Sequence, residues 1–176
     1  MKKGIFTIVC LMMFIAITAD AQSKKDKEII QDSKDAKADF IEGDASMASH
    51  FSSAYGYTIF PNVGKGAIGI GGASGHGTAY QGGVLVGMTK LSQLTIGFQW
   101  GGQAYREVVF FKNKAAMDRF KENKTEFSAQ VSAVAVTAGV SADAAYVDGV
   151  MVFTMQKGGL MYEAAVGGQK FKFDPL

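Results

Sequence analysis

The chain has 176 residues, which is enough for one compact domain and short for two. Its 18 basic and 16 acidic residues leave a formal net charge of +2, which is too balanced for the electrostatic footprint of a nucleic-acid-binding protein. A hydrophobic fraction of 48% supports a real core and excludes wholesale disorder. The combination of 22 glycines with 2 prolines excludes a collagen-like chain and indicates many turns or close backbone approaches.

The first 21 residues have the pattern of a secretory signal peptide. Lys2 and Lys3 are followed by an apolar run to residue 18, and residues 19–21 place small side chains at the two positions that a signal peptidase reads. We therefore expect export of a chain that begins at Gln22, to the periplasm, the outer-membrane surface or the extracellular medium. An uncleaved anchor is the alternative, but the run is shorter than the roughly 20 residues that a spanning helix needs. Cleavage removes the single cysteine, Cys10, which suits an oxidising compartment.

Residues 22–44 are the charged part of the chain and are predicted to form an amphipathic helix. Ile29, Ala36 and Phe40 recur at helical spacing, so we expect one thin apolar stripe to pack on the domain that follows at 45–176. The charges of this helix are mixed, unlike the basic polar face of a membrane-surface helix. A second short helix, after a break at Gly43, is predicted by the spacing of Met47, Phe51 and Ala54.

From Gly56 onward the hydrophobic period changes to two, which predicts strands. We expect the first of them, at 57–60, to stop at the turn signal Pro61-Asn62. A short helix at 114–124, with Met117 and Phe120 facing inward, separates strands in the second half. Further strands are expected at 94–100, 105–111, 127–140, 150–155, 160–166 and 169–173. The alanine content of 127–140 leaves a helix as the alternative there. Glycine pairs between the runs indicate hairpins, so the expected fold class is α+β: a twisted, mainly antiparallel, possibly barrel-like sheet with N-terminal helices and one short inserted helix.

The densest glycine segment, residues 64–77, contains the spacing G-x-G-x-x-G at 64–69. Dinucleotide binding requires a strand before this motif and a helix that opens at its end. Here a proline turn precedes the motif and more glycine follows it, so we expect no nucleotide. We interpret the segment instead as strands that glycine allows to bend sharply or to pack backbone to backbone.

Patterns for catalysis and metal binding are weak. His50 lies on the second predicted helix and His76 in a glycine loop, with no cysteine and no carboxylate cluster nearby. There is no G-x-S-x-G elbow, and the carboxylates are scattered singly rather than paired for acid–base work. The sequence therefore predicts a protein that is not an enzyme and uses no cofactor or metal.

Basic residues form the remaining signal. They outnumber acidic residues in the strand–helix unit at 105–124, and further single lysines lie in predicted turns. A positive face beside apolar side chains suits anionic lipid headgroups, because each Lys or Arg near such a surface contributes about 1 kcal/mol. Ordinary solubilising charge is the alternative interpretation of any one lysine. The candidate lipid-binding residues are Lys65, Arg106, Lys112, Lys114 and Lys157.

Several segments together resemble the SYLF lipid-binding domain. Residues 56–66 (GYTIFPNVGKG) look like its opening signature, and residues 69–77 look like its glycine-rich strand pair. Residues 96–103 are similar to the central segment of the SYLF domain, and residues 108–111 are similar to the apolar strand that follows that segment. Residues 157–161 and 167–171 are similar to its C-terminal hairpin. The resemblance spans about residues 45–176 in the order of the family.

The resemblance implies a non-enzymatic module that binds membrane lipids, which are phosphoinositides or phosphatidic acid in eukaryotic members; some of these members also bind actin. For an exported chain we expect a general anionic phospholipid surface as the partner, no nucleic acid, and an envelope protein as a possible second partner. Lys65 and Lys157 fall inside the matched motifs. The mixed-charge helix at 22–44 departs from the N-terminal amphipathic helix on which lipid binding depends in some relatives.

Two other functions remain open at this point. One is a protein-interaction or envelope-scaffold module that uses the same sheet. The other is a small outer-membrane β-barrel, which the alternation at 94–100 favours. Residues 84–86 and 150–155 are apolar on both faces and weigh against the barrel.

Overall fold

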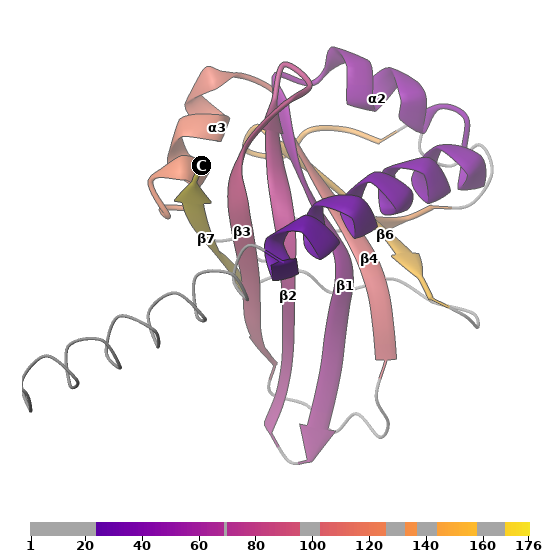
Figure 1. Ribbon diagram of the computed structural model, residues 1–176, viewed down its shortest axis with the longest axis vertical. Helices are drawn as coiled ribbons and strands as arrows, with labels where there is room; N and C mark the ends of the chain where they lie inside the picture. Colours follow the sequence, from indigo (N-terminus) through magenta and orange to yellow (C-terminus); the bar gives the residue numbers. More distant parts are fainter. Residues whose placement is uncertain (1–23, 69, 96–102, 126–132, 137–143, 158–167) are drawn as a thin grey trace, which may run out of the picture.

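The computed structural model describes residues 24–68, 70–95, 103–125, 133–136, 144–157 and 168–176. Helices in the N-terminal part lie beside one tall sheet, and a third helix lies near the C-terminus (Figure 1). The architecture is α+β with N-terminal helices, as predicted. The elements are a helix at residues 24–43, α2 (Met47–Ser53), β1 (Gly56–Ile68), β2 (Ile70–Gln81), β3 (Val84–Thr95), β4 (Gln103–Phe111), α3 (Lys114–Lys121), β5 (Ala133–Ala135), β6 (Val150–Gln156) and β7 (Gln169–Pro175).

The strands form one open sheet in the order β5-β6-β4-β1-β2-β3-β7. All neighbouring pairs are antiparallel except the short parallel pair of β5 and β6. This confirms the expected mainly antiparallel sheet. No helix in the described ranges is long and apolar enough to cross a membrane.

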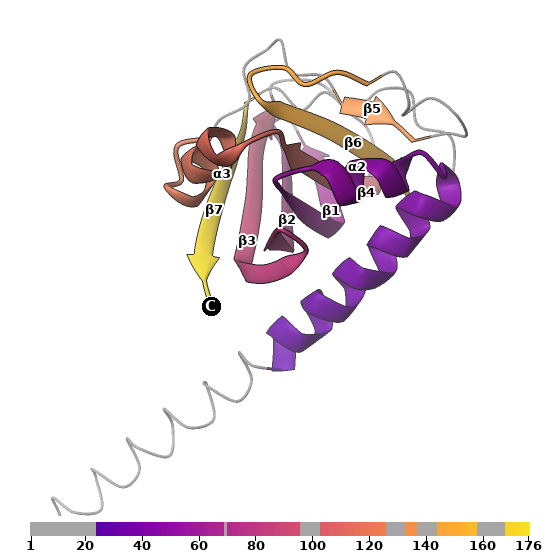
Figure 2. The same cartoon turned by 90° about the horizontal axis from the view of Figure 1, so that it is seen from above.

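The part of the sheet around β4 is buried on both faces because helices cover it from two sides. Figure 2 shows α3 near β7 on one side and the helix at 24–43 with α2 on the other. Along β4, Val108 and Phe110 pack with the N-terminal helices, whereas Val109 and Phe111 pack in the cluster that includes α3. A strand covered on both faces has a continuous apolar run rather than alternation, which is what residues 108–111 show.

The helix at 24–43 contacts the sheet through a narrow stripe, as predicted. Ala36 and Phe40 are buried against Tyr57, Ile59 and Phe110 of the sheet, while most of the other side chains of the helix are partly or fully exposed. Burial of a narrow stripe by a charged helix is typical of a helix that packs on a soluble domain.

Strand β1 differs from its prediction. It does not stop at Pro61-Asn62 but continues to Ile68. The register of β1 against β2 shifts between Ile59 and Asn62, and its register against β4 shifts between Phe60 and Val63. A strand accepts a proline at such an irregularity because the ladder of hydrogen bonds is interrupted there and no amide hydrogen is needed.

Glycine allows β1 and β2 to approach closely. A side chain at Gly77 would collide with the carbonyl oxygen of Ile59, and a Cβ at Gly75 would lie 2.8 Å from the carbonyl oxygen of Asn62. The predicted backbone-to-backbone packing is therefore confirmed at these two positions. His76, between them, lies on strand β2, so its predicted place in a loop was wrong.

The C-terminal half follows its predicted pattern where it is described. Phe171 and Phe173 of β7 are buried, whereas Lys170 and Lys172 are exposed. Helix α3 buries Met117 and Phe120 as expected but ends at Lys121 instead of residue 124. The predicted strand at 160–166 lies outside the described residues. Of the predicted strand at 94–100, the structure describes only residues 94–95, which form the end of β3. Of the predicted strand at 127–140, it describes residues 133–136, and β5 occupies 133–135 of these.

A buried polar contact links two strands that are not neighbours in the sheet. The Gln169 side-chain amide on β7 donates a hydrogen bond of 2.9 Å to the Glu107 carboxylate on β4, and both residues are fully buried. Burial and the nearby Glu107 charge raise the pKa of Tyr105 well above its usual range. The sheet is thus curled enough for β4 and β7 to meet across its inner side.

Candidate anion-binding site

The register of β2, β3 and β7 places three basic side chains in one row across the outer face of the sheet. His76 of β2 pairs with Lys90 of β3, and Lys90 pairs with Lys172 of β7. All three residues are exposed. Residues that pair directly across antiparallel strands present their side chains on the same face, and like charges placed in this way destabilise a sheet. The pairing of Lys90 with Lys172 therefore does not stabilise the fold.

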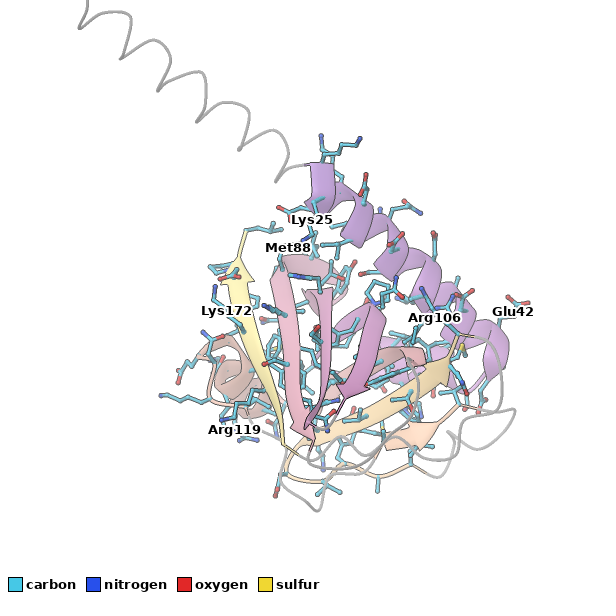
Figure 3. All side chains as sticks on the ribbon, turned by 90° about the horizontal axis from the view of Figure 1, so that it is seen from below. Lys25, Glu42, Met88, Arg106, Arg119 and Lys172 are labelled. Atoms are coloured by element: carbon cyan, nitrogen blue, oxygen red, sulfur yellow. The ribbon has the colours of Figure 1, made fainter. Side chains whose placement is uncertain are left out.

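The first turns of the N-terminal helix lie over this row. In Figure 3, Lys25 at the start of the helix lies near Met88 of β3, and Lys172 projects from β7 on the same side. A groove of about 360 Å³ lies between them, lined by Lys25 and Ile29 of the helix together with Met88 and the row itself. Cationic and apolar groups therefore face the same hollow.

Two carboxylates also line the groove, and they leave it one net positive charge while His76 is neutral. Asp26 belongs to the helix, and Asp174 of β7 accepts an ion pair of 3.0 Å from the Lys172 ammonium group. Both side chains of that pair are mostly exposed, so the pair is weak and exchangeable. Lys90 has no carboxylate partner among the residues that the structure describes.

The pKa of His76 is sensitive to the charges that line the groove. Partial burial lowers the pKa of His76 below its usual value of 6.5, and the positive charges of Lys25 and Lys90 lower it further. Asp26 acts in the opposite direction and does not reverse the shift. The part of the shift that comes from Lys25 and Lys90 reflects a positive potential at His76, and such a potential attracts an anion.

Two of the predicted lipid-binding residues, Arg106 and Lys157, lie together at a different place. The Arg106 guanidinium is 2.6 Å from the Asp39 carboxylate of the N-terminal helix. The Lys157 ammonium donates a hydrogen bond of 2.9 Å to the Asn62 side-chain oxygen. Burial, followed by the charge of Arg106, lowers the pKa of Lys157. The helix thus supplies a negative partner to this pair, and Figure 3 shows Arg106 beside its later turns.

The predicted residues Lys112 and Lys114 lie beyond the opposite end of β4. About 20 Å of strand separates Arg106 from Lys112, at roughly 3.3 Å per residue. Lys114 begins α3, and its ammonium group is 2.6 Å from the Asp118 carboxylate, whose hydrogen bond and charge raise the pKa of Lys114. The structure therefore does not bring the predicted residues onto one face. The side chain of Lys65 lies outside the described part, although its backbone pairs with Ala73 and Gln103.

The row at His76, Lys90 and Lys172 was missed as a unit by the sequence analysis. The alternation at 169–173 correctly placed Lys172 on the outer face, but nothing local to the sequence shows which residue stands opposite it. Lys90 and Lys172 are 82 positions apart in the chain, so the site becomes visible only when the register of β3 and β7 is known.

Titratable groups elsewhere do not form a comparable centre. Within the described ranges, no three His, Cys, Asp or Glu side chains gather in a way that could hold a metal ion. His50 packs near the rings of Phe110 and Phe153, with ring centroids 5.9 and 5.3 Å away. It is therefore part of the packing beneath the N-terminal helices.

Comparison with known proteins agrees with the resemblance seen in the sequence. Residues 92–175 match the family model Ysc84, which is described as "Las17-binding protein actin regulator". Over this range the chain is similar to the Ysc84 (SYLF) family. The SYLF match includes Lys172, Arg106 and the C-terminal strands, whereas β1, β2 and Lys90 precede it.

A relative supports the same assignment. A segment of 74 residues, which is 42% of this chain, is 30% identical to "Beta cell expansion factor A" of Aeromonas veronii. The matched part covers 28% of that relative, so the chain spans well under a third of its length. SYLF domains are binding domains and are not known as enzymes, so the match supports a lipid- or protein-interaction domain.

Proposed function

We propose that this domain binds the surface of anionic phospholipid membranes, peripherally and without catalysis. The observation that carries the proposal is the direct pairing of Lys90 with Lys172 beside His76 on an exposed face. An arrangement that repels itself in the free protein is stabilised when an anion lies between the charges. Phospholipid phosphates supply such anions at high local density.

The apolar groups at the groove also fit a lipid surface. Ile29 and Met88 line the same hollow as Lys25, Lys90 and Lys172. A peripheral protein gains affinity both from cations near headgroup phosphates, at about 1 kcal/mol each, and from apolar side chains that reach the acyl boundary. Both kinds of group are present on one side of the molecule.

The residues first singled out from the sequence are expected to contribute less. Arg106 and Lys114 each have a carboxylate at 2.6 Å, closer than the 3.0 Å that separates Lys172 from Asp174, and this reduces the charge that they offer to a membrane. Lys112 and Lys157 are exposed and are expected to add to the general positive field. We assign these residues a supporting role.

We also propose that the protein acts in the cell envelope after export. The support is the signal-peptide pattern of residues 1–21, with Gln22 as the first residue of the processed chain. The mass of the protein recovered from an envelope fraction tests this directly. A mass that begins at Gln22 supports the proposal, and a mass that includes residues 1–21 contradicts it.

Vesicle flotation tests the membrane proposal. Purified protein is expected to float with vesicles that contain phosphatidylglycerol and to remain behind with vesicles of phosphatidylcholine alone, and salt should weaken recovery because screening acts on exposed charges. The double variant Lys90→Gln with Lys172→Gln should lose most recovery, whereas the control Lys114→Gln should keep it. Equal recovery with both vesicle types contradicts the proposal.

A protein partner is the second candidate, and the family description favours it, since that description names a protein that binds Las17 and regulates actin. An envelope protein with an acidic surface would be attracted by the same groove. The flotation result separates the two candidates: a chain that ignores both vesicle types but is cross-linked to one envelope protein through Lys90 favours the protein partner.

A further inference from the structure

We infer that the groove beneath the first turns of the N-terminal helix is a discrete site for one phosphate ester group, held by Lys25, Lys90 and Lys172 and bordered by His76. The inference rests on the proposed function and goes further, because a membrane surface can attract a charged face without any headgroup entering a defined site. Three properties of the groove favour a defined site: the elements that supply its cations, its charge balance and its apolar lining.

The first reason is that the cations come from separate elements and surround one hollow. Lys25 lines the groove from the helix, and Lys90 and Lys172 line it from the neighbouring strands β3 and β7. Three ammonium groups around one hollow suit a phosphate, which offers several oxygens as separate acceptors. A planar carboxylate is better matched by the planar fork of an arginine, and the groove contains none.

The second reason is the charge balance. With Asp26 and Asp174 included, the groove has one net positive charge when His76 is neutral and two when it is protonated. A phosphodiester has one negative charge, and a phosphomonoester has between one and two near neutral pH. The charges of the groove and of such a ligand therefore cancel, whereas a polyanion would leave charge uncompensated.

The third reason is that apolar side chains line the same groove as the cations. Ile29 and Met88 line the groove next to the cations, so a ligand with a phosphate at one end and an aliphatic group at the other fits its polarity. Either a lipid headgroup or a free phosphate ester of a small alcohol has this chemistry. The experiment below distinguishes these two sources.

His76 provides a readout that belongs to this site. The charged groups that face it are Lys25 and Asp26 of the helix, Lys90 of β3, and Lys172 and Asp174 of β7, while its pairing partner on β1 is Asn62. An anion bound among these lysines would offset their charge and raise the pKa of His76 from its lowered value. By linkage, the same anion would bind more tightly as pH falls through that range.

The experiment follows the imidazole resonances of His76 by NMR during a pH titration, first without ligand, then with glycerol 3-phosphate, and then with vesicles of phosphatidylglycerol. His50, on α2, is the internal reference, and a His76→Gln spectrum assigns the two signals. The pKa of His76 is expected to rise by about half a unit or more with ligand, while the His50 resonances should not respond to the ligand. In Lys90→Gln the rise should disappear and the affinity for the phosphate ester should fall about tenfold. Lys34→Gln, at an exposed position of the helix that does not line the groove, is the matched control and should behave as the natural chain does.

Each outcome has a defined meaning. A rise with both ligands supports the site and shows that it accepts free phosphate esters, and a rise with vesicles alone supports it as a headgroup site. If the His76 pKa does not move with either ligand although flotation shows vesicle binding, the discrete site is overturned while the membrane function stands. If neither the pKa shift nor flotation is observed, both are overturned. Lys90→Arg, which keeps the charge, should retain the shift and shows that Lys90→Gln acts through charge rather than through loss of the fold.

Discussion

The helix at 24–43 contributes negative charge to one group of cations, Arg106 and Lys157, and positive charge to the other, Lys90 and Lys172. At its later turns the helix at 24–43 presents Asp39 to Arg106, and the basic pair formed by Arg106 and Lys157 is partly neutralised. At its first turns the same helix places Lys25 over Lys90 and Lys172, which adds positive charge to an already positive row. A count of lysines and arginines cannot separate these cases. The position of the nearest carboxylate decides which cations are available to a ligand.

The largest effect is expected from breaking the helix contact on which this comparison depends. Phe40 is fully buried in the cluster beneath the helix, so Phe40→Ala should lower the free energy of unfolding by about 3–5 kcal/mol. Urea denaturation measures this change. The exposed Val84, changed to alanine, is the control and should stay within about 0.5 kcal/mol. A loss below about 1 kcal/mol for Phe40→Ala would mean that the helix is not anchored at this point.

The next effect is expected from removing two lysines of the basic row. Lys90→Gln combined with Lys172→Gln should weaken binding to phosphatidylglycerol vesicles by about tenfold to a hundredfold, because two cations of about 1 kcal/mol each are lost. Co-sedimentation at several salt concentrations measures both the affinity and its salt dependence. The matched pair Lys112→Gln with Lys114→Gln has the same change in net charge. Equal losses in the two double variants would show that total charge, and not the row, governs binding.

A gain in affinity for anionic vesicles is expected when the carboxylate that partly neutralises Arg106 and Lys157 is removed. Asp39→Asn removes the carboxylate beside Arg106, so the affinity for anionic vesicles should rise about threefold to fivefold. The free energy of unfolding should fall by no more than about 1 kcal/mol, since both partners are partly exposed. Asp35→Asn changes the same net charge on the helix at an exposed position and should have a smaller effect on binding. An Asp39→Asn protein with unchanged affinity would indicate that Arg106 cannot reach the membrane.

The smallest effect concerns pH. Because the pKa of His76 lies below 6.5 in the free protein and should rise when an anion binds, affinity for anionic vesicles should increase as pH falls from about 7 and level off once His76 is protonated in both states. The expected increase is about twofold to fivefold. His76→Gln should bind at neutral pH as the natural chain does and lose this increase. A persistent increase in His76→Gln would assign the pH dependence to another group.

The sequence was informative wherever structure is set by local periodicity. Met117 and Phe120 were placed inside α3, and Phe171 and Phe173 inside β7, because spacing along one element decides which face is apolar. The predicted end of β1 at Pro61 was wrong because the bulge that accommodates this proline depends on the partner strands β2 and β4. The basic site was out of reach for the same reason, since the pairing of Lys90 with Lys172 is a property of register. Local charge density pointed instead to Arg106 and Lys114, whose carboxylate partners only the fold reveals.

One substitution separates ligand binding from folding more directly than any other. Lys90→Glu replaces a like-charge pair by an opposite-charge pair across β3 and β7, so the free energy of unfolding should rise by about 0.2–1 kcal/mol. The same change should reduce binding to phosphatidylglycerol vesicles by tenfold or more, because it reverses a charge at the centre of the row. A protein that becomes more stable while it releases the membrane is the predicted result. If Lys90→Glu binds anionic vesicles as tightly as the natural chain does, the row is not where the lipid is held.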